Sequence, residues 1–456
     1  MNLEVDYQYL KFSQLENTTF WDYYTLSNTN VIASLYPLVK LRDVLVQRKT
    51  SIIIDDNKLY KRCRVQIRAR GVALRDEVFG SEIKIKKQQV CKTDDFLVAE
   101  IDAKVGGYGI IPENLEGAIV SSHYFLFEID RAKLSPEYLG IIIKQEQFSR
   151  QIKSTGSTNY AAIRPYHVLG YEIPLPPLTE QVKIVSDYYK AINQSKQINE
   201  RITQLEIGIK EYIFKELGLN NSSGRLRKKG LQVVLFNSIS EWGLDKIISS
   251  SNNHSKHFNV VSISNRPDIA VNIFRGKSPR YSSKTGAFIL NQKCNRWNEI
   301  DLQFSKTVDK TWFDSIDKEI LTRVGDVLIN STGEGTIGRA SYITENHQGL
   351  LYDSHILLLR LNVSVIDPEL FVELFNSSYG QNQVNDIKSA QATKQTELGI
   401  SNLKKVFIPL PESLEFQKTM VTHIKNIRTQ IFQLKSKSDT IEMIAKSEFQ
   451  KILFAK

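Results

Sequence analysis

The chain has few cysteines and no long apolar run, and each shortage excludes a class of protein. Three of its 456 residues are cysteine, at positions 63, 91 and 294. Their wide spacing matches neither a disulfide framework nor a zinc-binding motif, so a reducing cytoplasm is the simple expectation. No apolar stretch approaches the roughly 20 residues that a membrane-spanning helix needs. The first residues, MNLEVDYQYLKF, lack the basic start and apolar core of an export signal, so secretion is not expected.

Positive charge is present in excess. The chain carries 60 Lys and Arg against 50 Asp and Glu, a formal net charge of +10. This balance favours an anionic partner, and nucleic acid is the commonest one, although plain solubility would also explain it. The apolar share of 41% is ordinary for a globular protein, and the length allows two or three domains with their own cores.

The sequence repeats itself at long range. The segment IPLPPLTEQ ends at Gln181, and IPLPESLEFQ ends at Gln417, 236 positions later. A step of 231 or 232 positions separates three further pairs: Asp95 and Asp326, Ser122-His123 and Ser354-His355, and Pro136 and Pro368. A drift of a few positions is what loop insertions produce. The chain is therefore predicted to hold two copies of one module, each a mixed domain followed by a long helix.

Each mixed domain is predicted to be rich in β-strands. In the first, apolar residues alternate over 65–74, and short apolar runs at 96–98 and 119–120 are bounded by glycine or aspartate. Two helices are expected near 136–143 and 144–153. Prolines at 174, 176 and 177 then end the domain, and Thr179 is a plausible start for a helix that runs to about residue 217. The second long helix is expected over about 414–453.

Both long helices carry a narrow apolar seam, which is typical of a coiled coil. A skip in the first seam at Ser195 predicts a stutter in the supercoil. The helices would each be on the order of 60 Å long, and we expect them to pack against each other antiparallel, with a mixed domain at each end. The seam residues are Val185, Tyr188, Ile192, Ile198, Ile202, Leu205, Ile209 and Tyr212 in the first helix, and Ile424, Ile427, Ile431, Leu434, Ser438, Ile441, Ala445 and Ile452 in the second.

The predicted fold class is therefore α+β, with two mixed domains, two long antiparallel helices and a pseudo-two-fold internal repeat. The expected organisation is an N-terminal extension over 1–34, the first domain over 35–173, the central helix over 174–219, a polar basic linker over 220–230, the second domain over 231–408 and the closing helix over 409–456.

No constellation of catalytic, cofactor-binding or metal-ligating residues is evident. The segment 333–338, GEGTIG, has the letters of a dinucleotide fingerprint, but residues 339–343 look like a strand, which leaves no helix N-terminus for a phosphate. Glycines at 106, 107 and 109 stand at the equivalent place in the first half, which predicts a shared backbone turn. His123 and His355 are flanked by apolar residues and are interpreted as buried, hydrogen-bonded structural histidines.

Basic and aromatic residues gather in each mixed domain instead. Such side chains can neutralise phosphates, and arginine can grip guanine through two hydrogen bonds. Arg68, Arg70, Lys84 and Lys86 alternate along apparent strands, which predicts a basic face; an ordinary solvated strand face is the alternative. The DNA-binding candidates are Arg62, Arg64, Arg68, Arg70, Arg75, Lys84, Lys86 and Lys87 in the first domain, and Arg275, Lys277, Arg280, Tyr281, Lys293, Arg296, Trp297 and Arg339 in the second.

These motifs resemble a known family. PLPPLTEQ at 174–181 is similar to the boundary between recognition domain and conserved helix in specificity subunits of type I restriction-modification systems, and the repeat resembles that family over nearly the whole chain. One departure is Phe416, which replaces the glutamate of the first copy. The boundary residues that the resemblance offers as partner-docking candidates are Pro176, Glu180, Gln181, Pro411 and Gln417.

The resemblance implies a DNA-reading protein without catalytic activity of its own. Each recognition domain would read one half of an asymmetric, bipartite target, and the helices would fix the unread gap. Two methyltransferase subunits, similar to adenine-N6 methyltransferases, would bind it, with restriction or translocase subunits as further partners. S-adenosylmethionine, ATP and Mg would belong to those partners. The alternatives are a specificity subunit of a related defence system without a separate motor, a stand-alone enzyme such as a nuclease, and a coiled-coil scaffold that binds only proteins.

Overall fold

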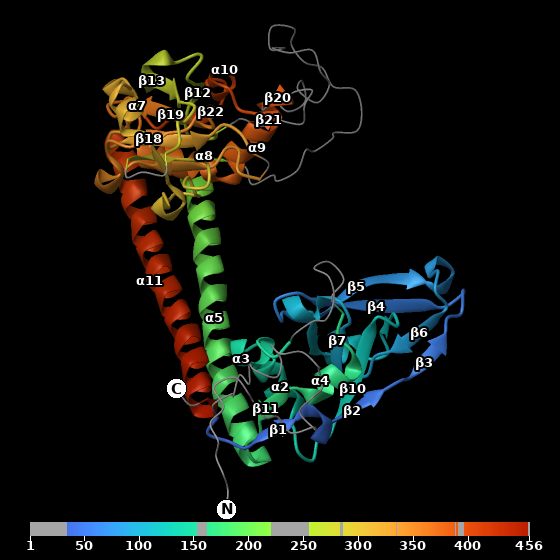
Figure 1. Cartoon of the computed structure of the whole chain (residues 1–456). Coiled ribbons are helices and arrows are strands. Elements are labelled where there is room, and N and C mark those ends of the chain that lie inside the picture. The colour runs from blue at the N-terminus through green and yellow to red at the C-terminus, as the bar shows by residue number, and fades with distance from the viewer. Residues whose placement is uncertain are drawn as a thin grey trace, which may run out of the picture. The chain divides into compact units, whose positions relative to one another are not determined.

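The structure is a computed structural model that describes residues 34–152, 162–219, 255–282, 286–333, 335–387, 389–390 and 396–454. The expected N-terminal extension, up to residue 33, and the basic linker lie outside the described residues. The chain divides into two compact units. The first unit combines the described residues up to 198 with those from 436 onward, and the second holds those between 199 and 435. Each unit therefore contains one mixed domain and part of both long helices (Figure 1).

The first unit is built from short strands followed by short helices. Tyr60, Cys63 and Val65 turn into the core along one of these strands, and a β-bulge between Arg62 and Cys63 shifts the alternation by one position. The strands and helices are β1 (Leu38–Lys40), β2 (Leu45–Arg48), β3 (Ser51–Ile53), β4 (Leu59–Gln66), β5 (Gly71–Phe79), β6 (Lys87–Val90), β7 (Phe96–Ala99), β8 (Tyr108–Ile110), β9 (Ile119–Val120), β10 (Tyr124–Ile129), α2 (Pro136–Ile142), α3 (Glu146–Ser149), α4 (Pro165–Gly170) and β11 (Glu172–Pro174).

The second unit follows the same plan. Its elements are β12 (Val260–Ser262), β13 (Ala270–Arg275), β14 (Ala287–Leu290), β15 (Lys306–Val308), α7 (Lys310–Asp314), β16 (Asp326–Asn330), β17 (Ala340–Tyr342), β18 (Leu351–Tyr352), β19 (Ile356–Leu361), α8 (Pro368–Asn376), α9 (Ser378–Ile387), β20 (Ser389–Ala390), β21 (Thr396–Glu397), α10 (Ile400–Leu403) and β22 (Phe407–Pro409). The strand predicted after the glycine-rich segment is confirmed by β17.

Strand order confirms the predicted repeat and fold class. The first unit has a four-stranded sheet of order β2-β10-β7-β8, and the second has the corresponding order β13-β19-β16-β17. The two-stranded sheets β1-β11 and β12-β22 also correspond. The remaining sheets differ, because the first unit carries a five-stranded sheet, β3-β6-β9-β4-β5, where the second carries three strands, β15-β14-β18. The two halves thus share a core sheet and differ in the sheet beside it.

The long helices are α5 (Leu178–Glu216) and α11 (Leu414–Leu453), within about two residues of the predicted ends. In the first unit, the start of α5 pairs antiparallel with the end of α11. At Ser195, where the apolar seam is interrupted, the two helices meet through polar side chains. Ser195 Oγ lies 2.8 Å from both Ser438 Oγ and Glu442 Oε1. A buried polar layer in an apolar seam fixes the register of paired helices.

One predicted seam residue is wrong. Ile452 is 39% exposed, whereas Phe449 and Leu453 are buried in the core of the first unit. The last turn of α11 therefore presents a different face from the one that the spacing predicts, because it packs on the mixed domain and not only on α5.

The first described residue of each mixed domain pairs with the C-terminal end of a long helix. In the first unit, Ser34 pairs with Phe454, and its Oγ donates to Leu453 O at 2.8 Å. In the second unit, Ser255 pairs with Leu219, and its Oγ donates to Leu217 O at 2.6 Å. The repeat is therefore circular: the helix that follows one domain completes the other.

The start of each long helix is held by a buried glutamine. Gln181 is fully buried; its amide donates to Lys133 O and Pro176 O, both at 2.8 Å, and accepts from Ser135 N at 2.9 Å. Gln417 repeats this pattern with the backbone of residues 365, 367 and 411. These hydrogen bonds join the first turn of the long helix to the N-cap of α2 or α8.

Replacing either glutamine by leucine is expected to destabilise the unit that contains it. Gln181→Leu would leave two carbonyl groups and one N–H without partners, and each buried unpaired group costs about 1–3 kcal/mol. We expect the free energy of unfolding to fall by about 3 kcal/mol or more in denaturant titrations. Gln197→Leu and Gln430→Leu, at exposed positions of the same helices, are the matched controls and should change it little. Equal effects at all four positions would contradict the assigned role.

Candidate nucleic-acid interface

The basic candidates of the first domain lie on and around the β4–β5 hairpin. Arg64 is exposed on β4, where the alternation of side chains turns it away from the core. The predicted strand face over Arg68, Arg70, Lys84 and Lys86 is wrong. Arg68 and Arg70 lie in the turn between β4 and β5, and the two lysines lie in the loop before β6. The basic residues are thus presented by a hairpin end and a loop.

Three of these candidates are engaged by carboxylates. Arg62 donates to Asp76 through Nε at 2.6 Å and Nη2 at 2.7 Å, and these hydrogen bonds raise the pKa of Arg62 and lower the pKa of Asp76. Arg75 lies 3.6 Å from the same carboxylate. Lys86 binds Asp56 and the carbonyl of Gly80. Part of the predicted positive charge is therefore compensated within the domain.

The other five candidates have no carboxylate partner among the described residues. Within the described part of the chain, no side-chain hydrogen bond or ion pair engages Arg64, Arg68, Arg70, Lys84 or Lys87, and all five are exposed. The turn that carries Arg68 is nevertheless rigidly placed. Its N–H donates to Val105 O at 2.6 Å, and the N–H of Ala69 donates to Gly106 O at 2.9 Å. Free cations on an anchored turn are suited to contact phosphates.

The predicted glycine turn supports this arrangement. Gly106, between β7 and β8, has φ +81°, and a Cβ there would meet Ala69 N at 2.5 Å. The equivalent connection between β16 and β17 contains Gly333 and Gly338 with φ +99° and +80°. Both connections need the left-handed backbone that glycine allows.

The candidates of the second domain are more often paired with aromatic rings. The guanidinium of Arg296 lies 4.7 Å from the ring centre of Phe304, and that of Arg339 lies 5.7 Å from Trp297. Tyr281, which is 55% exposed, lies under Lys306 at 4.7 Å. Such stacking orients the cation without itself cancelling the charge. Arg296 Nη2 also lies 3.9 Å from Asp301 Oδ2, so its charge is partly offset.

Arg275 differs from its neighbours, since its Nη1 lies 2.7 Å from Glu397 Oε1 and its Nε donates to Ser354 O at 3.2 Å. Among the described residues, no side-chain hydrogen bond or ion pair engages Lys277, Arg280 or Lys293.

The interpretation of His123 and His355 as buried is wrong. Both are exposed, and the His123 side chain is 68% accessible. Their hydrogen bonding is confirmed, since each ring Nδ1 lies 2.8 Å from a side-chain oxygen, Glu100 Oε2 and Thr332 Oγ1 respectively. The residues that flank them are apolar because the strands begin there, and the histidines themselves stand one position outside those strands.

Metal clusters and membrane-spanning helices are both absent from the described ranges. They hold no group of three or more His, Cys, Asp or Glu side chains arranged for a metal ion. None of their helices has both the length and the apolar character of a membrane span.

The sequence matches a family model over much of its first half. Residues 34–205 match the model described as the type I restriction modification DNA specificity domain. Over these residues the chain is similar to the DNA specificity domain of type I restriction-modification systems. No curated protein matches the sequence.

Solved structures add a likeness in fold. One chain, from a structure described as the basis of complex assembly and conformational transition of the type I R-M system, has a TM-score of 0.52 at 17% identity, covering 91% of this chain and 96% of that one. The HsdS subunit from Thermoanaerobacter tengcongensis has a TM-score of 0.38 at 17% identity, covering 91% and 95%. The type I S subunit from M. genitalium has a TM-score of 0.45 at 11% identity, covering 94% and 98%.

The partner-docking candidates lie mostly inside the protein. Pro176, Gln181, Pro411 and Gln417 are buried, and the glutamine side chains are engaged by the chain itself. Only Glu180, which is half-buried, has a side chain partly open to a partner. The boundary motif therefore has a structural role, which is to fix where each long helix starts.

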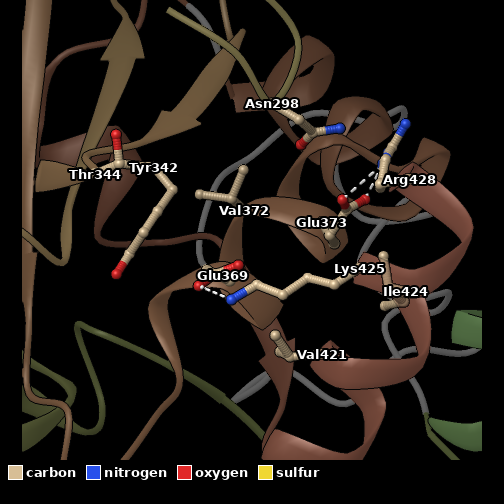
Figure 2. A pocket seen from close by; sticks show the side chains of 10 residues that line it. All are labelled: Asn298, Tyr342, Thr344, Glu369, Val372, Glu373, Val421, Ile424, Lys425 and Arg428. Carbon is tan, nitrogen blue, oxygen red and sulfur yellow. Dashed lines mark hydrogen bonds and ion pairs between the residues drawn. The ribbon is translucent and has the colours of Figure 1, made fainter. Parts of the chain in front are cut away.

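In the second unit, two ion pairs connect α8 to α11 across a hollow of about 230 Å³ (Figure 2). Lys425 Nζ lies 2.7 Å from Glu369 Oε1, and Arg428 donates to Glu373 through Nε and Nη2 at 2.9 and 2.7 Å. Burial opposes the charge of Arg428, but the hydrogen bonds to Glu373 outweigh it, so the pKa of Arg428 is raised. None of the DNA-binding candidates lines this hollow. The ion pairs instead fix the second mixed domain on the helix.

Proposed function

We propose that this chain is the sequence-specific DNA-binding subunit of a type I restriction-modification complex. The observation that carries the proposal is the repeated four-stranded sheet, together with the specificity-domain match over residues 34–205. In this role the chain positions DNA and performs no chemistry. Methyl transfer and cleavage, with S-adenosylmethionine, ATP and Mg, belong to its partner subunits.

The target is an asymmetric sequence in two parts. The shared core sheet supports two domains that bind DNA in the same way, and the different sheets beside it support two different half-sites. Both recognition domains present cations without carboxylate partners among the described residues, such as Arg64 and Arg68 in the first domain and Lys277 and Lys293 in the second. These charges supply the sequence-independent part of the affinity.

The long helices serve as the ruler and as the docking surface for two methyltransferase subunits. Large apolar side chains are exposed on the outside of both helices, which is unusual for a solvated helix and typical of a partner-binding surface. The exposed positions are Val182, Tyr189 and Ile207 on α5 and Phe432, Met443, Ile444 and Ile452 on α11.

Mapping N6-methyladenine across the source genome, with and without this gene, tests the proposal. We expect methylation to disappear from one asymmetric motif with an unread gap when the gene is deleted, and to return when the intact gene is restored. A gene carrying a stop codon after residue 219 is the matched control and should not restore it. A methylation map that does not change on deletion, in cells that express the partner subunits, would contradict the proposed function.

A further inference from the structure

The two exposed histidines stand in the same backbone frame in both recognition domains. His123 O accepts from Glu100 N at 2.9 Å, and His355 O accepts from Ser331 N at 2.8 Å. The carbonyls of Glu100 and Ser331 in turn accept from the N–H groups of residues 163 and 398, at 2.9 and 2.7 Å. Each histidine therefore lies where one core strand ends, β7 or β16, and its antiparallel neighbour begins, β10 or β19.

In both domains the imidazole is oriented by one of its nitrogens. Nδ1 is held by Glu100 or by Thr332, each at 2.8 Å. Within the described residues Nε2 has no partner in either ring, so it is the nitrogen that is available to a ligand. An exposed side chain that is held in one orientation loses little conformational entropy on binding.

A guanidinium is fixed beside each histidine. Arg164 Nη1 donates to Glu100 Oε1 at 2.6 Å, so one carboxylate holds both side chains. In the second domain Arg275 binds Glu397 at 2.7 Å, and Glu397 pairs through its backbone with Thr332, the residue that holds His355. Both arginine side chains are about half exposed, at 56% and 48%. A histidine and an arginine thus lie together in both domains, although different residues hold them in place.

Each histidine and its neighbouring arginine form a cluster, and the charge of these two clusters suits the edges of base pairs better than phosphates. Each guanidinium lies against a carboxylate, which offsets its attraction for an anion while leaving other N–H donors free in a fixed orientation. Oriented donors and acceptors without net charge can distinguish the edges of base pairs. The free cations lie nearby in the first domain, because the turn that follows Glu100 accepts hydrogen bonds from Arg68 N and Ala69 N.

We infer that His123 with Arg164, and His355 with Arg275, are two equivalent base-reading sites, each contacting a base pair in one half of the DNA target. The inference rests on the proposed function and adds the residues that specify sequence. In this arrangement the surrounding free lysines and arginines hold the phosphates, and the two clusters read the bases.

Alanine variants at the two histidines test the inference, in the full chain with its partner subunits present. The probes are a duplex carrying the mapped target and duplexes in which one half-site is scrambled. His123→Ala should weaken binding to the target by about tenfold to a hundredfold, the range expected for one lost base contact. It should leave binding unchanged when the half-site that its domain reads is already scrambled. His355→Ala should behave in the same way at the other half-site.

Two further variants separate reading from folding. His123→Asn and His355→Asn keep an amide donor near Nδ1 and remove Nε2, so they should unfold like the wild type and still lose discrimination. His347→Ala is the matched control, since this ring also binds a threonine through Nδ1, at 3.0 Å from Thr344 Oγ1, and residue 115 at the equivalent place is leucine. Its binding should be unchanged.

The outcomes are distinct. Equal loss on target and scrambled duplexes would make the histidines phosphate contacts and overturn the inference, and so would unchanged binding by the alanine and asparagine variants. If the wild-type complex itself binds all duplexes alike, the proposed function fails, and that result is visible before any variant is measured.

Discussion

Replacing Arg68 and Arg70 together by alanine should weaken DNA binding by about tenfold to a hundredfold at moderate salt and reduce its salt dependence. Each phosphate contact contributes about 0.9 to the slope of log affinity against log salt, so two lost contacts should lower the slope by about 2. The reason is structural. The turn is anchored by Arg68 N and Ala69 N, and neither arginine side chain is compensated by a carboxylate of the described residues.

The matched control removes the same amount of positive charge, but from two arginines that already pair with carboxylates. Arg131 binds Asp94, and Arg150 binds Glu146 on α3, with both arginine side chains more than 60% exposed. The double alanine variant at these positions should bind DNA almost as the wild type does. Since phosphates carry no sequence information, the Arg68/Arg70 variant should also keep its preference among targets. A variant that lost preference while keeping its salt slope would show that this turn reads bases.

Inserting four residues into each long helix should lengthen the unread gap of the target. The insertions would follow Ile198 in α5 and Lys435 in α11, where the two compact units divide. Four residues add about 6 Å to a helix, and one base pair occupies about 3.4 Å, so the gap should grow by about one or two base pairs. The methylated motif, mapped as above, reports the new gap directly.

Helical phase decides whether such a variant folds. Four residues are close to one turn and keep the apolar seam on the same side. Two inserted residues rotate the seam by about 200° and would expose residues such as Ile202 and Ile431, which are buried. That variant should not assemble. A four-residue variant that folds, methylates and keeps the original gap would contradict the role of the helices as a ruler.

The sequence predicted the long helices well and the surface contacts poorly. The ends of α5 and α11 agree within about two residues because capping residues and seam spacing are local features. Arg164 was missed, since no other Lys or Arg stands within ten positions of it in the sequence and its partner Glu100 is 64 positions away. The two histidines were misjudged because apolar neighbours mark the start of a strand as well as a buried site.

The sequence by itself determined that the chain is a repeat of one module, because spacing recurs along the chain whatever the fold brings together. Only the tertiary structure decided which side chains remain available to DNA or to a partner. Arg62 is engaged by Asp76 across a hairpin, while Arg64, two positions away, is free of such a partner among the described residues. Gln181 in the boundary motif is engaged by a carbonyl 48 positions upstream. Such pairings depend on which strands and helices come together, and that information lies in the packing of distant segments.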